Sequence, residues 1–175
     1  MLQKLLNNKN ISIKEYLYII LLLSFVLRTL TSIFNIGYFA VDDYYLLSKS
    51  VPAQLAEMLD QMNLNTVGSV GYRNPFIEIW IHWIANLAYK SGFFDPINQI
   101  RVIFISLGLF SLLTVYFGWK IFHTIGRNDF AIIGAFSLGT HFMMPFVSTR
   151  TLIESMSAPF VIISLYSLIV YNVTN

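Results

Sequence analysis

The stretch Tyr16–Phe34, which reads YLYIILLLSFVLRTLTSIF, decides the class of this protein. A helix needs about 20 mostly apolar residues to cross the hydrocarbon core of a bilayer. This stretch is long enough, and Arg28 is its only charge. It is too long for the apolar region of a cleaved signal peptide, and it lacks a cleavage site of small residues. We therefore expect a retained anchor that crosses the membrane.

The composition of the whole chain agrees with membrane insertion. Hydrophobic residues make up 56% of the chain and charged residues only 11%, about half the charged fraction of a typical soluble domain. The net charge of +2 comes from cations scattered singly between apolar runs, which predicts no nucleic-acid partner. The absence of cysteine excludes disulfides, thiolate metal sites and a cysteine nucleophile.

Hydropathy predicts four or five spanning segments in all. They cover about 16–34, 76–90, 102–122, 130–147 and 152–171. The predicted fold is an all-α, polytopic transmembrane helical bundle that forms a single membrane domain, 1–175. Since the chain stops just past an apolar run, we expect it to be the N-terminal part of a longer protein.

The segment 76–90 is the marginal one, because a polar stripe runs along it. Glu78, His82, Asn86 and Lys90 recur every fourth residue and share one face of a helix. This helix either spans with its stripe toward a wet bundle interior or lies along the interface, and the spanning arrangement is favoured. His82 is expected to pair with Glu78 rather than to bind a metal, because no further ligands follow at metal-site spacing.

The longest polar stretch, 35–75, joins the first two segments and is rich in acidic residues. Lys4, Lys9 and Lys14 precede the first segment. By the positive-inside rule they place the N-terminus in the cytoplasm and this large loop, with short helices, outside it. The cations near the later loops fit no single topology, so the sequence leaves the later crossings open.

Two groups in this loop carry candidate chemistry. Asp42 and Asp43 follow the outer end of the first helix among aromatic residues, where a partly desolvated carboxylate can act as a general base. The alternative is that one of them caps a helix. Arg73, at the predicted membrane boundary, can hold a phosphate in a two-pronged fashion, or it can simply snorkel at a helix end.

A third polar group, Ser148–Ser157, lies between the last two segments. Arg150 and Glu154 are four residues apart and could simply pair with each other. Ionisable residues at membrane depth are nevertheless functional candidates by default, so both are retained as site residues.

These three groups, in this order, resemble the N-terminal part of the Alg9-like mannosyltransferases, which include the GPI-anchor mannosyltransferases and belong to the GT-C superfamily of polytopic glycosyltransferases. The matching elements are the acidic pair Asp42-Asp43, the element Gly71–Pro75 and the element Thr149–Thr151. The sequence departs from the family at Asp43, where Glu is usual. It departs again at Glu154, where Asn is usual, and at Ser157, where Glu is usual.

The resemblance implies inverting transfer of a sugar from a polyprenyl-phosphate donor to a glycan or lipid-linked acceptor. It implies that Asp42 or Asp43 deprotonates the acceptor, and that Arg73 and Arg150 stabilise the leaving phosphate. Glu154, Glu78 and His82 would support them. No metal or other cofactor is required on this reading. A divergent bacterial member would lie in the inner membrane, and a eukaryotic one in the endoplasmic reticulum.

Two other functions are compatible with the sequence. A transporter or lipid flippase would need ionisable residues near the bilayer midplane and broken helices, preferably with an internal repeat. The sequence shows no repeat and places most charges in loops or at helix ends. A structural membrane subunit would leave the acidic loop unexplained, so the transferase hypothesis leads.

Overall fold

The computed structural model describes residues 12–34, 75–141, 143–151 and 153–174. Apart from short turns, these residues are helical, and they contain no strand. The helices are α2 (Ile13–Phe34), α5 (Pro75–Lys90), α6 (Pro96–Thr124), α7 (Asn128–Thr140), α8 (Met143–Val147) and α9 (Ile153–Thr174). The predicted all-α class is confirmed for this part of the chain.

In the described part of the chain, three helices are long and apolar enough to cross a membrane: α2, α6 and α9. The sequence predicted four or five spanning segments, and the other two are shorter than a crossing requires. α5 has 16 residues and α7 has 13, which at 1.5 Å per residue gives about 24 and about 20 Å. The hydrocarbon core is about 30 Å thick.

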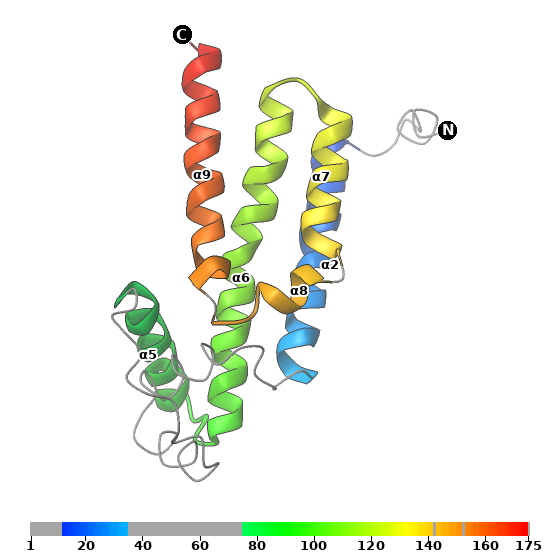
Figure 1. Ribbon diagram of the computed structural model, residues 1–175. Helices are drawn as coiled ribbons and strands as arrows, with labels where there is room; N and C mark the ends of the chain where they lie inside the picture. Colours follow the sequence, from blue (N-terminus) through cyan, green and yellow to red (C-terminus); the bar gives the residue numbers. More distant parts are fainter. Residues whose placement is uncertain (1–11, 35–74, 142, 152, 175) are drawn as a thin grey trace.

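The long helix α6 lies at the centre of the bundle, and α2, α7 and α9 pack against it (Figure 1). The start of α2, the turn between α6 and α7, and the end of α9 lie at one end of the bundle, drawn at the top of Figure 1. Lys14, Lys120 and Arg127 belong to that end. Asp95 caps the start of α6 at the opposite end through the backbone N–H of Ile97, and Pro96 follows the cap.

A proline explains why the predicted segment 130–147 is not one continuous helix. Pro145 has no N–H, and its ring would clash with the carbonyl four residues earlier, which belongs to His141. The helix α7 ends at Thr140, and His141 is extended (φ −51°, ψ 131°). The short helix α8 then contains Pro145 as its buried residue. The apolar run therefore bends inside the bundle.

The helix α5 lies along the first half of α6, with Trp80 against Ser106 and Phe110 (Figure 1). Its buried face consists of small and aliphatic residues: Ile81, Ile84, Ala85 and Ala88. His82 and Lys90 of the polar stripe are exposed. The favoured arrangement, a spanning helix with its stripe toward the bundle interior, is not what the described side chains show.

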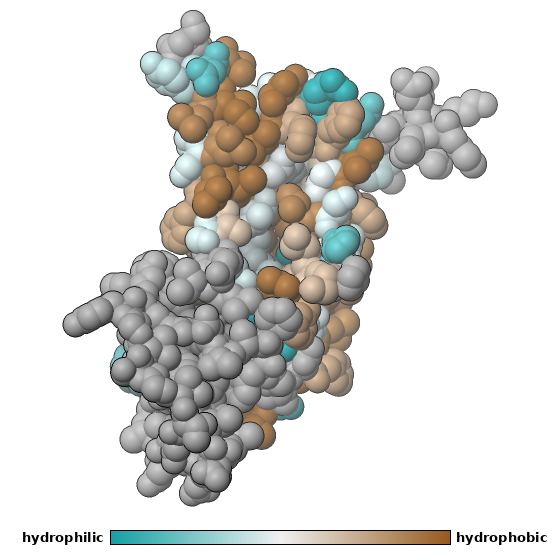
Figure 2. Space-filling model, viewed as in Figure 1, coloured by the Kyte–Doolittle hydropathy of each residue, from teal (hydrophilic) through white to brown (hydrophobic). Residues whose placement is uncertain are grey.

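Much of the exposed surface of the described helices is apolar. Figure 2 shows hydrophobic side chains over the visible faces of α9, α6 and α7. Large exposed residues on these helices include Leu109, Phe136, Val161 and Leu168. An exposed surface of this kind on helices of this length is typical of contact with lipid.

The helices α2 and α7 approach each other closely at Gly139. A Cβ added at Gly139 would lie 2.1 Å from Oγ of Ser24, whereas one added at Gly134, on the same helix, would meet only the Phe122 ring at 3.5 Å. We expect Gly139→Ala to lower the free energy of unfolding by about 1–3 kcal/mol through overpacking. We expect Gly134→Ala to be neutral or stabilising, because alanine favours helix. Thermal denaturation midpoints in mild detergent test this pair, and equal midpoints for both variants would contradict the close approach.

The length of α6 generates a second prediction. Its 29 residues extend about 43 Å, so we expect its two ends to lie on opposite sides of a bilayer. The chain has no cysteine, which allows single exposed cysteines to report the side. In intact cells, a membrane-impermeant maleimide should label only one of Ser91→Cys and Ile125→Cys. The other should react only after permeabilisation. Labelling of both from one side would show that α6 does not cross.

Candidate functional site

A buried arginine occupies the centre of the bundle. Arg28 lies on the buried face of α2 together with Ser24 and Ser32, and only 3% of its surface is exposed. Gly108 of α6 faces it, since a Cβ there would lie 3.2 Å from Cβ of Arg28. The small residue at this position lets α2 and α6 approach closely enough to enclose the guanidinium.

Neutral oxygens hold the guanidinium in place. Nε donates to Oγ of Ser111 (2.8 Å), Nη1 donates to the carbonyls of Gly139 (2.9 Å) and Ser24 (3.3 Å), and Nη2 donates to the carbonyl of Leu138 (3.4 Å). Among the described residues, Arg28 therefore has no acidic partner. Charged side chains within membrane helices are costly and rare, and they mark functional sites by default.

The carbonyls of Leu138 and Gly139 are available because α7 ends there. The last four C=O groups of a helix have no intrahelical donor, and α7 ends at Thr140. The end of a helix also carries a partial negative charge of about half an electron. Arg28 thus caps the interrupted helix, and this offsets part of its positive charge.

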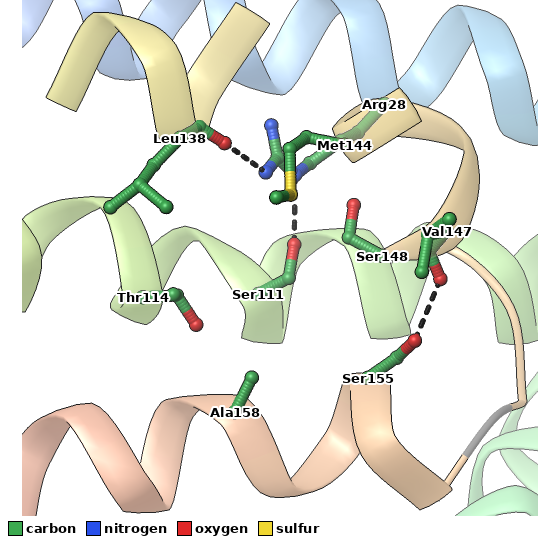
Figure 3. Close-up of a pocket in the computed structure, with 9 residues that line it drawn as sticks. All are labelled: Arg28, Ser111, Thr114, Leu138, Met144, Val147, Ser148, Ser155 and Ala158. Atoms are coloured by element: carbon green, nitrogen blue, oxygen red, sulfur yellow. Dashed lines mark hydrogen bonds between the residues drawn. The ribbon is translucent and has the colours of Figure 1, made fainter. Parts of the chain in front are cut away.

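A cavity of about 220 Å³ opens beside Arg28. Its polar lining combines the arginine with four hydroxyl residues, which are Ser111, Thr114, Ser148 and Ser155, and its apolar lining consists of Leu138, Met144, Val147 and Ala158. Figure 3 shows these nine side chains converging from α2, α6, α7, α8, the turn after α8, and α9. We call this space the Arg28 cavity.

The second buried cation is in the turn between α8 and α9. Thr149, Arg150 and Thr151 are fully buried, which is unusual for such a polar run. Thr149 donates its hydroxyl proton to the carbonyls of Pro145 (3.1 Å) and Phe146 (2.9 Å). The Arg150 guanidinium carbon lies 4.7 Å from the centre of the Phe104 ring and 4.5 Å from that of Phe146, within cation–π range.

The helix α6 brings the two arginines to neighbouring levels of the bundle. Gly108 faces both Arg28 and the Cγ2 of Thr149, and the ring that contacts Arg150 belongs to Phe104, one turn earlier on α6. Residues of the first helix and of the turn before the last are therefore neighbours across α6. The interior polar layer contains two cations that are far apart in the sequence.

Three of the site residues predicted from the sequence, Asp42, Asp43 and Arg73, fall outside the described residues. Glu78 and Glu154 lie in the first turns of α5 and α9, but their side chains are not among those described. Arg150 and His82 are described, and the structure does not bring them together.

His82 lies on the outside of α5 and contacts Asn86 one turn later, with Nε2 2.8 Å from Nδ2. Among the described residues, no cluster of three His, Asp or Glu side chains could hold a metal ion.

Sequence reasoning missed the part that α6 contributes. Ser111 and Thr114 sit in an apolar run, and hydroxyl residues are common in membrane helices, where they donate to the helix's own carbonyls. Their spacing of three residues is the only local signal that they share a face. The pairing of Ser111 with Arg28, which is 83 residues away, has no signature in a single sequence.

Comparisons with known proteins give no relative. No protein-family model matches the chain, and neither a curated protein nor a solved structure matches it.

The Arg150 environment generates a prediction about shape rather than charge. Lysine preserves the positive charge, but it lacks the planar group that lies against the Phe104 and Phe146 rings. A desolvated cation–π contact contributes about 2 kcal/mol, so Arg150→Lys should lower the denaturation midpoint in detergent by several degrees.

The matched control is Arg127→Lys, because the exposed Arg127 lies 4.3 Å from the Phe130 ring and an exposed contact contributes less. Equal midpoints for the two variants would show that the burial of Arg150 adds nothing to stability.

Proposed function

We propose that this chain belongs to a membrane-bound glycosyltransferase that moves a sugar from a polyprenyl-phosphate donor to a glycan or lipid-linked acceptor, with inversion at the anomeric carbon. The observation that carries the proposal is the fully buried polar turn Thr149–Thr151 with its cation. It corresponds to the Arg-Thr element of the GT-C mannosyltransferases that the sequence resembles. A buried cation beside apolar helices suits an anionic group joined to a hydrocarbon tail.

The proposed reaction is a single displacement. Asp42 or Asp43 accepts the proton of the acceptor hydroxyl, and that oxygen forms a bond to C1 of the donor sugar. The bond from C1 to the phosphate oxygen breaks on the opposite face, and the phosphate leaves with the electron pair. Arg73 and Arg150 stabilise its developing charge. Glu154, Glu78 and His82 are assigned supporting positions around these groups.

In the proposed reaction, Arg150 acts from the protein interior, because its side chain is fully buried. Its contacts with Phe104 and Phe146 fix the plane of the guanidinium. A fixed cation of this kind stabilises transition-state charge without reorganising during the reaction. The tail of the donor would remain in lipid, which accounts for a transferase built on membrane helices.

A transporter or lipid flippase is the second candidate, and one specific observation favours it. Arg28 is buried in the bundle interior and caps α7, whose apolar run is interrupted before α8. Ionisable residues beside interrupted helices are the features that mark substrate sites in transporters. Proteoliposomes that move a labelled polyprenyl-phosphate sugar across the bilayer, without forming a glycosylated product, would favour this function over transfer.

The transferase proposal predicts the effect of removing the base. With polyprenyl-phosphate mannose as donor, Asp42→Asn or Asp43→Asn should lower turnover about 10²–10⁴-fold, and the double variant should be inactive. Asp129→Asn is the control, because Asp129 is exposed in the first turn of α7, at the end of the bundle where the chain begins. Undiminished turnover in the double variant would exclude these carboxylates as the base.

A further inference from the structure

The guanidinium of Arg28 has one more N–H donor than the hydrogen bonds it makes to described residues. Arg28 has five N–H donors, and four hydrogen bonds use them, all to neutral oxygens of described residues. The partial charge at the end of α7 offsets only about half of the cation. Among the described residues, no acidic side chain balances the rest.

A second observation in the same cavity points to a ligand. The hydroxyl oxygen of Thr114 is buried and has no hydrogen-bond partner within the described structure, although Thr114 lines the cavity. A buried polar atom without a partner costs about 1–3 kcal/mol. An oxygen-rich ligand between Arg28 and Thr114 would satisfy the threonine hydroxyl and the remaining guanidinium donor together.

The first turn of α9 adds to the positive character of the cavity. Ser155 lies in that turn and lines the cavity wall (Figure 3). The start of a helix carries a partial positive charge and backbone N–H groups without intrahelical partners. Ser111, Ser148 and Ser155 donate their hydroxyl protons to the carbonyls of Gly108, Pro145 and Val147. The donors left for a ligand are therefore one guanidinium N–H, the Thr114 hydroxyl and the start of α9, a combination that suits a phosphate.

The apolar wall and the depth of the cavity indicate how such a phosphate would arrive. Leu138, Met144, Val147 and Ala158 line the remaining wall, between α7 and α8 on one side and α9 on the other (Figure 3). Arg28 lies six residues, or about 9 Å along the helix axis, from the end of α2 at Phe34. If α2 spans the hydrocarbon core, Arg28 is therefore nearer to one boundary of the core than to its centre. A phosphate carried on acyl chains fits this place better than a fully hydrated ion does.

We propose that the Arg28 cavity binds the phosphate group of an anionic membrane phospholipid, whose acyl chains leave along the apolar wall between α7 and α9. The volume of about 220 Å³ equals that of roughly seven water molecules at ~30 Å³ each, enough for a phosphate and part of its glycerol. The proposal does not depend on transferase activity.

The test uses the whole chain, purified in a neutral detergent without phosphate. Native mass spectrometry with added phosphatidylglycerol should show one retained lipid per chain, whereas phosphatidylcholine at the same concentration should be retained at least tenfold less. Arg28→Gln should lower retention of phosphatidylglycerol at least tenfold. Arg127→Gln removes an exposed cation in the turn between α6 and α7 and should leave retention of phosphatidylglycerol unchanged.

A second variant keeps the proposal falsifiable if Arg28→Gln does not fold. Ala158→Leu adds bulk to the apolar wall while Arg28 and its partners stay in place, so it should also lose the lipid while retaining its helical circular dichroism and its elution volume. Retention equal to the original chain in this folded variant would overturn the proposal.

The source of the phosphate is tested in the same preparation. Inorganic phosphate alone should not raise the denaturation midpoint, whereas phosphatidylglycerol should raise it by several degrees. A rise with inorganic phosphate that equals the lipid effect and disappears in Arg28→Gln would overturn the lipid as the occupant. Because these readouts need no turnover, failure of the lipid site and failure of the transferase are distinguishable.

Discussion

The placement of one positive charge inside an apolar bundle constrains the rest of this structure. Arg28 is enclosed by α2, α6 and α7, and each helix supplies an oxygen that accepts a hydrogen bond from its guanidinium. α6 presents Gly108 and the hydroxyl of Ser111. α7 presents carbonyls near its end, which are available because the helix stops there. The proline interrupts the apolar run, and the arginine donates to carbonyls that the interruption leaves without a helical donor.

The same interruption creates the polar turn before α9. A continuous helix over 130–147 would have carried the chain across the bundle and placed the following hydroxyls and Arg150 at its surface. The bend at His141 instead returns the chain inside the bundle, where Thr149, Arg150 and Thr151 are fully buried. Backbone that is not helical is tolerated at membrane depth only where protein or a wet cavity surrounds it. The hydrogen bonds of Thr149 and the aromatic contacts of Arg150 supply that surrounding.

Hydropathy was sufficient to predict the elements that face lipid. The apolar runs 16–34, 102–122 and 152–171 correspond to α2, α6 and α9, with ends that differ by up to six residues, because every backbone group of a spanning helix is satisfied within the helix itself. The break after α7 was readable from Pro145 but was missed, because hydropathy does not register a missing N–H. The polar stripe on α5 was recognised, but its exposure was not the favoured arrangement, because periodicity identifies a face without saying what the face contacts. The Arg28 cavity needed coordinates, since its lining comes from residues far apart in the chain.

The two buried arginines bear differently on function, and the difference lies in their partners. Arg150 lies within cation–π distance of two rings, which suits a group that holds a charge at a fixed place. Arg28 is held by carbonyls and a hydroxyl beside an open cavity that also contains a hydroxyl without a partner, which suits a group that still has an anion to bind. Both cations lie against α6, where Gly108 faces Arg28 and the Cγ2 of Thr149, so one small residue of the central helix admits the first helix and the polar turn at the same level.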